Sequence, residues 1–384
     1  MIECYSCKSK KTESIFKIDE CPIAGNFLSD TSKDELIPLD VLFCNDCGLV
    51  QVDKNMFVPK EKLFVNYFYK THCIKTLVDF FYEQAEEIND GGGKKVLEIG
   101  GNSCPLGEKL IELGNEVINV DPSNVAKNNK PDGLILINDF FNNKVASSIK
   151  EKYNTMDVVY SANNFAHMED LFEVIEGIKT VLSEDGELII QVQDLEYLLD
   201  ELCFPFFYHE HLFYYNVQSL EHLLSNFGFE LIRTKRNKIH GGSLNCVFKK
   251  SNSITPTEVD LTELKNKINK FGERVDEVQN QVLSFIKGKK VVAYGASGQA
   301  NIMFAKFGIT NKDIPYIIDD APLKKDKYTP YSHIQIKDLE FLKEYEPDYI
   351  FLTAYNFFDE IKNKNKWFKG KWIVPLPYFK VVEE

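Results

Sequence analysis

One pattern constrains the fold of this chain more than any other: an apolar strand that runs into a glycine turn and then a helix. The first copy begins with the strand at residues 94–99, and its second strand ends at Asp121. The second copy begins at residues 289–294, and its second strand ends at Asp319. Strand, glycine turn, helix and parallel strand make up the βαβ unit of nucleotide-binding sheets. We therefore predict an α/β protein with two Rossmann-like units.

The length of 384 residues exceeds one ordinary domain and leaves room for a third part. We expect an N-terminal module over residues 1–75, a first α/β domain over 76–250 and a second over 251–384. Residues 258–287 carry apolar side chains in alternating steps of three and four, which predicts one long amphipathic helix. A coiled coil is the alternative to a connecting helix that docks on its own domain.

The N-terminal module contains two CxxC pairs, Cys4 with Cys7 and Cys44 with Cys47. Each pair can place two thiolates on a tight turn, and two such turns complete a tetrahedral zinc site. All four positions are filled by the chain, so we expect structural zinc. The alternatives are free thiols and a redox pair, and neither CxxC lies in the βαβ pattern of a redox motif. We expect the other cysteines to be buried small side chains: Cys21, Cys73, Cys104, Cys203 and Cys246.

Composition excludes several classes of protein. Hydrophobic residues make up 44% of the chain, enough for real cores, and the net charge is −13. An acidic chain is a poor general binder of nucleic acid or anionic membranes. The sequence contains no apolar run of the roughly 18 residues that a membrane span needs. Its first residues lack the apolar core of a signal peptide, so we expect a cytoplasmic protein.

The first glycine turn favours S-adenosylmethionine (SAM) over a dinucleotide. Glu98, Gly100, Gly101 and Asn102 follow the spacing E-x-G-x-G-x-G, with Asn102 and Cys104 at the last two glycine positions. A dinucleotide needs those glycines because its pyrophosphate approaches the helix N-terminus, whereas SAM has no phosphate. Asn tolerates positive φ better than most residues. A bare turn without a ligand is the alternative.

Further cofactor contacts are expected where later strands end, because ligands bind at the carboxyl ends of such sheets. Asp121 can accept bonds from ribose hydroxyls. Asp139 can reach an adenine amino group and Phe140 can stack on the ring, or the two form a helix cap and a core aromatic. Asn163 and Asn164 follow the next strand.

The densest chemistry lies at residues 206–215, which include Tyr208, His209, Glu210 and His211. A neutral His can abstract a proton while a neighbouring carboxylate orients it. The spacing of the two histidines does not match the HExxH metal motif. The alternative is a polar and aromatic interface with satisfied histidines. His240, Gly241, Gly242 and Ser243 follow, and two glycines beside a His indicate close backbone approach, to an anion or to the SAM site.

The order of these motifs resembles that of the deoxysugar C-methyltransferases, and the resemblance covers nearly the whole chain. The motifs that carry it are the four cysteines Cys4, Cys7, Cys44 and Cys47, Glu98-Ile-Gly100, Asp121-Pro-Ser123, Asn163-Asn-x-x-His167, Tyr208-x-Glu210-His211, His240-Gly-Gly-Ser-Leu244, Tyr294-Gly-Ala296, Tyr328-x-Pro330-x-x-His333 and Pro347 to Asn356.

The resemblance implies SAM-dependent methylation of a nucleotide-linked 4-keto-deoxysugar, with C3 as the expected carbon. It implies His211 as general base, Tyr208 and Glu210 as its neighbours, and His167 close to the reacting centre. Tyr67 and Tyr69 would lie in the segment that closes over the sugar. The C-terminal domain would hold the nucleotide diphosphate. We expect contacts to the substrate from His240, Gly241, Gly242, Ser243, Tyr294, Gly295, Ser297, Asn301, Asp319 and Asn356.

Three places depart from the family pattern. The usual Ser-Asn-Asp-Gly is Gly101 to Cys104, the usual Ala-Lys-Gly-Asn is replaced at Ser297 to Asn301, and the usual Pro-Gly-Thr-His is Pro330 to His333. The second change removes a lysine that could face a phosphate. These changes indicate a different substrate rather than a different fold.

Other functions remain open on the sequence alone. An O- or N-methyltransferase could use the same scaffold, and an inactive zinc-containing scaffold could use both Rossmann-like units as a ligand sensor. An NAD oxidoreductase would use Gly295, Gly298 and Asp319. We expect a monomer or a weak homodimer.

Overall fold

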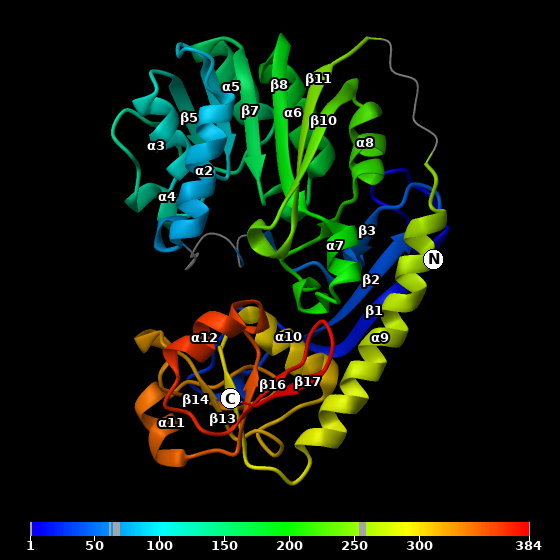
Figure 1. Cartoon of the computed structure of the whole chain (residues 1–384). Helices are drawn as coiled ribbons and strands as arrows, with labels where there is room; N and C mark the ends of the chain where they lie inside the picture. The colour runs from blue at the N-terminus through cyan, green and yellow to red at the C-terminus, as the bar shows by residue number, and fades with distance from the viewer. Residues whose placement is uncertain (1, 61–62, 64–69, 253–258, 384) are drawn as a thin grey trace.

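The computed structural model describes residues 2–60, 63, 70–252 and 259–383. Within these residues the strands form sheets of four, seven and six strands. Figure 1 shows the seven-stranded sheet with its helices above the six-stranded one, and the four-stranded sheet beside the long helix α9 (Thr262–Ile286) along one side of both.

The four-stranded sheet combines the N-terminal segment with a strand from the middle of the chain. Its order is β1-β2-β3-β9 and its pairs are antiparallel. In β1, buried Phe16 and Ile18 alternate with exposed Lys17 and Asp19, as expected for a strand with one solvated face. Its strands are β1 (Thr12–Pro22), β2 (Leu36–Cys44), β3 (Val50–Val52) and β9 (Phe213–Tyr214).

The seven-stranded sheet has the order β10-β11-β8-β7-β4-β5-β6. Five parallel strands make its doubly wound part, and β11 and β10 form an antiparallel hairpin at one edge. This confirms the first Rossmann-like unit. The strands are β4 (Lys95–Ile99), β5 (Glu116–Val120), β6 (Ile135–Ile137), β7 (Met156–Ala162), β8 (Leu182–Gln193), β10 (Phe229–Asn237) and β11 (Ser243–Lys250).

Helices cover both faces of this sheet. Apolar side chains of α2 and α3 pack on one face, and those of α5, α6 and α8 pack on the other. Two short helices, α4 and α7, follow the carboxyl ends of β5 and β8. The bounds are α2 (Lys75–Ile88), α3 (Pro105–Glu112), α4 (Asn124–Asn128), α5 (Asn143–Tyr153), α6 (Leu171–Val181), α7 (Leu195–Asp200) and α8 (Val217–Ser225).

The six-stranded sheet is the second Rossmann-like unit. Its order is β14-β13-β12-β15-β16-β17, and all pairs are parallel except the last. Helix α10 packs on one face, and α11 and α12 pack on the other. The elements are β12 (Val291–Tyr294), α10 (Gly298–Phe307), β13 (Tyr316–Ile318), β14 (Gln335–Lys337), α11 (Leu339–Tyr345), β15 (Tyr349–Leu352), α12 (Phe358–Lys364), β16 (Lys371–Val374) and β17 (Lys380–Val382).

Helix α9 confirms the amphipathic prediction and docks within its own chain. Its apolar stripe is buried in a core that also contains Phe16 of β1, Leu198 of α7 and Phe304 of α10. One continuous core therefore joins the N-terminal sheet, the end of the first α/β unit and the second α/β unit. In the part of the chain that the structure describes, no helix is both long and apolar enough to cross a bilayer.

Candidate active site and zinc site

The two CxxC pairs meet at the end of the β1–β2 hairpin. The Sγ atoms of Cys4 and Cys47 lie 3.6 Å apart, those of Cys7 and Cys44 also lie 3.6 Å apart, and all four lie within 4.8 Å of one another. Zinc–sulfur bonds of about 2.3 Å in a tetrahedron separate the sulfurs by about 3.8 Å. The four thiolates therefore fit a zinc ion. Gly48, directly after the second pair, has φ 75°, which glycine adopts without strain.

The expectation for the remaining cysteines is wrong at one position. Cys73 is exposed, whereas the other four are buried. It lies in a short 3₁₀ helix, Thr71–Cys73, that leads into α2. That helix stands at the surface next to the cofactor turn rather than in a core.

The glycine turn after β4 keeps a left-handed backbone at each glycine position of the SAM pattern. The φ angles are 72° at Gly100, 53° at Asn102 and 60° at Cys104. Asn102 and Cys104 therefore adopt the conformation for which glycine is usual. A Cβ atom on Gly100 would lie 1.7 Å from the Nδ2 atom of Asn164, so the turn tolerates no side chain there.

A buried pair of side chains, Glu98 and Cys104, stabilises this turn. Glu98 is 3% exposed and Cys104 is 1% exposed, and the thiol donates a hydrogen bond of 2.8 Å to Oε2 of Glu98. The Cys104 Sγ also occupies space beside Gly107, where an added Cβ would approach it to 2.5 Å. Burial raises the pKa of the Glu98 carboxyl to about 7.

Asp121 lies at the carboxyl end of β5, beside the turn. Its Oδ2 accepts a bond of 2.8 Å from the Asn102 N–H, and its Oδ1 accepts one of 2.8 Å from the Ser123 N–H. The structure thus brings Glu98, the glycine turn and Asp121 together, as a ribose-binding site requires. Asp139 and Phe140 follow β6 at the same edge of the sheet, where Asp139 is exposed and the Phe140 ring lies 5.0 Å from Nζ of Lys60.

Asn163 and Asn164 follow β7 at this edge. Asn164 donates to the carbonyl oxygens of Ile99 (3.1 Å) and Gly100 (3.0 Å), so it braces the turn. Oδ1 of Asn163 is buried and has no hydrogen-bond partner among the described residues. A buried polar atom without a partner is costly unless a ligand satisfies it. The residues at this edge therefore fit SAM.

The segment that carries His211 follows α7. The Nδ1–H of His211 donates to the Phe206 carbonyl at 3.2 Å, and the Tyr208 hydroxyl, 3.0 Å away, donates to Nε2. The bond at Nδ1 thus leaves the lone pair on Nε2. His211 is 8% exposed, and its ring centre lies 4.8 Å from that of His167.

His167 and Glu210 are neighbours of this base. Nδ1 of His167 donates to the backbone carbonyl of Glu210. Burial lowers the pKa of His167, so its ring is neutral at pH 7, and burial raises the pKa of Glu210 to about 7. His209 points the other way and bonds the Pro38 carbonyl at 3.2 Å. His209 and His211 therefore bond to different parts of the chain.

The turn around Gly241 and Gly242 packs on the base segment. Their φ angles are 75° and 101°, and added Cβ atoms would lie 3.1 Å from the Phe206 ring and 2.4 Å from the Tyr197 ring. Ser243 is buried and bonds the Ile239 carbonyl at 2.8 Å. His240 lies in the 3₁₀ helix of this turn. Tyr67 and Tyr69 lie outside the described residues.

The residues directly after Tyr69 reveal a contact that the sequence did not predict. The N–H and hydroxyl of Thr71 lie 3.0 and 3.2 Å from Oδ1 of Asn102, and Nδ1 of His72 lies 2.8 Å from Oγ of Ser103. The chain is therefore fastened to the cofactor turn just beyond the tyrosine stretch.

The carboxyl edge of the second α/β unit gathers four of the ten predicted substrate contacts. Gly295 and Ser297 follow β12, Asp319 follows β13 and exposed Asn356 follows β15. The Tyr294 ring instead lies in the core beneath α11 and α12. Asn301 is fully buried, and its Nδ2 donates to the Ala24 carbonyl at 2.7 Å, so it fastens α10 to the N-terminal segment.

A lysine from another part of the sequence contacts this turn. Nζ of Lys324 donates to the Ala296 carbonyl at 2.7 Å and lies 3.1 Å from Oδ2 of Asp319. Thr353 supports the same turn through a bond of 2.6 Å to the Gly295 carbonyl. The sequence held no signal for either role, because both residues reach the turn through the sheet and not along the chain.

Comparison with known proteins agrees with this arrangement. Residues 4–64 match the family model of a zinc binding domain, residues 69–234 that of a methyltransferase domain, and residues 238–377 that of a C-methyltransferase C-terminal domain. The chain is thus a SAM-dependent methyltransferase with a zinc-binding module. More particularly, the match at residues 238–377 makes it similar to the C-methyltransferases.

One relative spans almost the whole chain. The C-methyltransferase NovU of Streptomyces niveus is 28% identical over 408 aligned residues, which cover 99% of this chain and 96% of that protein. Among solved structures, a SAM-dependent methyltransferase of Mesorhizobium loti has a TM-score of 0.35 at 13% identity and covers 45% of this chain and 100% of its own. Magnesium protoporphyrin IX methyltransferase of Synechocystis with bound SAM has a TM-score of 0.34 at 13% identity and covers 46% of this chain and 79% of its own.

Proposed function

We propose that this enzyme methylates C3 of a nucleotide-linked 4-keto-deoxysugar, with His211 as the general base. The sugar and its nucleotide rest on the resemblance of the motifs described above. The base rests on the residues themselves, because a C–H bond next to a ketone is only weakly acidic. Its removal needs a base and a stabiliser for the enolate oxygen.

One observation supports this proposal most: residues 163–167 contact the cofactor turn at one end and the base at the other. Asn164 bonds the Gly100 carbonyl at 3.0 Å, and the His167 ring lies 4.8 Å from the His211 ring. The Leu212 N–H also bonds the Ala166 carbonyl at 2.7 Å. A short segment thus sets the distance between the methyl donor's binding turn and the group that would create the carbanion.

In the proposed reaction, the bond from the Tyr208 hydroxyl to Nε2 of His211, 3.0 Å long, breaks as the substrate binds. This frees the Nε2 lone pair to take the C3 proton, the C–H electron pair becomes the enolate, and the Tyr208 hydroxyl donates a hydrogen bond to the enolate oxygen. SAM, when bound at the turn after β4, would supply the methyl group that C3 takes up and leave as S-adenosylhomocysteine. Burial of His211 and His167 keeps water from competing for the proton.

The nucleotide diphosphate would lie at the carboxyl edge of the six-stranded sheet. The N-terminus of α10, which begins at Gly298, and the Lys324 ammonium group supply positive charge there. Asp319 balances the charge of the lysine. This placement gives a role to the six-stranded sheet, whose described residues do not include His211, Tyr208 or His167.

The test is incubation with labelled SAM and a panel of nucleotide-4-keto-6-deoxyhexoses, with the methylated atom identified by NMR. His211→Ala should lower methyl transfer by about 10²- to 10⁴-fold, the usual contribution of a general base. The matched control is His222→Gln on α8, which should retain activity. If the folded His211→Ala protein loses only a few-fold of its methyl-transfer rate, His211 is not the general base. If NMR finds the methyl group on oxygen or nitrogen, the enzyme is not a C-methyltransferase.

A further inference from the structure

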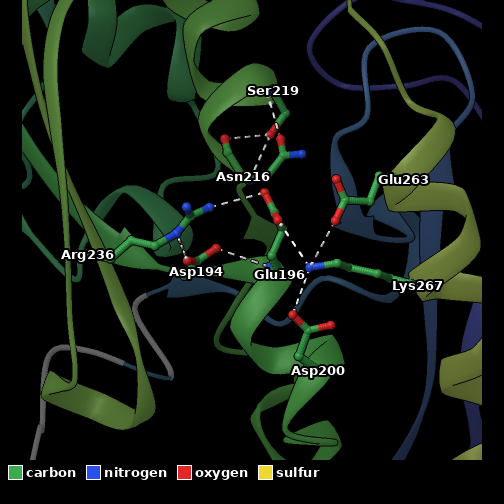
Figure 2. Close-up of polar contacts among 8 residues, drawn as sticks. All are labelled: Asp194, Glu196, Asp200, Asn216, Ser219, Arg236, Glu263 and Lys267. Carbon is green, nitrogen blue, oxygen red and sulfur yellow. Dashed lines mark hydrogen bonds and ion pairs between the residues drawn. The ribbon is translucent and has the colours of Figure 1, made fainter.

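Helix α7 is held by charged residues from two other elements, which Figure 2 shows. Nζ of Lys267, on α9, lies 2.7 Å from Oδ2 of Asp200 and 3.3 Å from Oε2 of Glu196. Glu263, one turn earlier on α9, lies 3.9 Å from the same ammonium group. Lys267 is only 20% exposed, so these ion pairs are less screened than pairs at an open surface. One lysine thus lies within ion-pair distance of three carboxylates.

A second cation of α9 binds the end of α7. Nη1 of Arg274 donates to the carbonyl oxygens of Leu199 (3.1 Å) and Asp200 (2.9 Å). These carbonyls belong to the last turn of α7, where the helix dipole favours a positive charge. Lys267 and Arg274 are separated by two turns, so both project from the same stripe of α9.

The start of α7 is fixed by β10. Asp194, the N-cap of α7, accepts a bond of 3.1 Å from the Glu196 N–H. Arg236 donates to Oδ2 of Asp194 at 2.7 Å and to Oε1 of Glu196 at 3.2 Å. Arg236 lies shortly before the turn at Gly241, which packs on Phe206.

The base segment leaves α7 directly and is also anchored to α9. Between Lys267 and Arg274 on α9 stands Phe271, which is fully buried, and its ring lies 5.6 Å from that of Phe207. Phe207 is adjacent to Tyr208, and the carbonyl of neighbouring Phe206 orients His211. The same stripe of α9 therefore contacts α7 and the turn that carries the base.

We propose that Lys267 and Arg274 are positioning residues for His211. They hold α7 in place, and the turn that follows α7 carries His211. The position of α7 therefore helps to set the distance between Nε2 of His211 and the cofactor turn, which residues 163–167 also fix. Lys267 offsets the repulsion between the carboxylates of Glu196 and Asp200, and Arg274 supplies a donor to the Asp200 carbonyl. This inference rests on the proposed function, because it assumes that His211 is the base.

The experiment compares Lys267→Met and Arg274→Met with Lys267→Arg, Arg274→Lys and the control Lys270→Met, an exposed lysine of the same helix. The full-length enzyme is assayed for kcat, for KM of the sugar nucleotide and for SAM affinity by calorimetry. Exchange of the C3 proton is measured in D2O with S-adenosylhomocysteine, which carries no methyl group to transfer. Thermal unfolding reports on the fold.

We expect kcat and the exchange rate to fall together by about 10-fold or more in both Met variants, since a misplaced base can cost 10²-fold. SAM affinity should stay within 2-fold, because the cofactor turn lies on another part of the sheet. Lys267→Arg and Arg274→Lys should recover most of the loss, and Lys270→Met should behave as the unmodified enzyme.

Unchanged kcat and exchange in the folded Met variants would overturn the positioning role, as would an equal loss of SAM affinity. If either Met variant fails to fold, Asp200→Asn can be tested instead, because this largely exposed carboxylate forms one of the ion pairs with Lys267. The Asp200→Asn variant should also have a lower kcat. An unchanged kcat in this variant would likewise overturn the positioning role. Absence of exchange in the unmodified enzyme would instead contradict the proposed function.

Discussion

Cys104 illustrates how one side chain can replace a glycine in a ligand-binding turn. It adopts φ 60° and ψ 47°, which costs a non-glycine residue about 1 kcal/mol or more. Its thiol donates to the buried Glu98 carboxyl at 2.8 Å and thereby satisfies a group that would otherwise be costly to bury. The hydrogen bond offsets the backbone strain.

Glu98 gives the protein a pH-dependent stability. Its pKa is about 7 when folded against an ordinary 4.5, so the folded state binds the proton more tightly. The contribution of Glu98 to stability is therefore fully present below pH 4.5 and is lost as the pH rises through 7, by an amount on the order of 3 kcal/mol. The glutamine side chain of the Glu98→Gln variant stays neutral at every pH. The free energy of unfolding of this variant, measured in urea titrations relative to the unmodified protein, should therefore increase between pH 5.5 and 8. A pH-independent difference would contradict this.

The identities of single residues were enough to predict part of the candidate cofactor site. Asn102 was expected to tolerate positive φ and does so, because its position in the pattern fixes the backbone. The partner of Cys104 could not be predicted, since Glu98 and Cys104 meet only after the strand and helix have packed. Lys324 was missed for the same reason: it is 27 residues from the turn's own Ser297, and only the parallel pairing of β12 and β13 brings it near.

At the scale of elements, the zinc knuckles hold the β1–β2 hairpin and, through β3, the strand β9 that follows His211. Removing the metal with a chelator should lower the unfolding temperature, because binding free energy of a structural zinc is folding free energy. Methyl transfer should fall as well, while SAM affinity should change less. Metal content and thermal unfolding are measured together, and restored zinc should restore both. An unchanged unfolding temperature after complete metal loss would contradict a structural role.

The turn at Gly295 leads to another prediction. Lys324→Met should raise KM for the sugar nucleotide by about 10-fold, the effect of losing one charge-assisted bond of roughly 1.5 kcal/mol. SAM affinity should stay the same. Lys325→Met provides the control, because Lys325 pairs with Asp338 and not with the turn. Equal KM values for both variants would show that Lys324 does not contact the substrate.

Elements with a strong local signal were predictable. Alternating steps of three and four residues defined α9, and the glycine turns defined the starts of both α/β units. Strand β9 was not, because two residues carry no periodicity and its partner β3 is more than 150 positions away. The surface on which α9 docks could not be predicted either. An amphipathic stripe shows that one face of a helix is buried, but it does not show which elements bury it.

At the scale of the whole molecule, the shared core makes the three parts depend on one another. Phe271 is fully buried where β1, the base segment and α9 meet. Phe271→Ala should lower the free energy of unfolding by about 3–5 kcal/mol. Because the core is continuous, denaturation should remain a single transition by fluorescence and circular dichroism. Separate transitions for the parts would contradict this continuity.

The pairing of β9 with β3 also limits how such enzymes can be recombined. Phe213 and Tyr214 take their hydrogen bonds from Gln51 and Val50, so each half of the pair belongs to a different stretch of the gene. A chimera that exchanges the first 75 codons alone would pair β9, the edge strand beside the base, with a foreign β3. A transplanted N-terminal module therefore needs the matching segment at 204–215 to come with it.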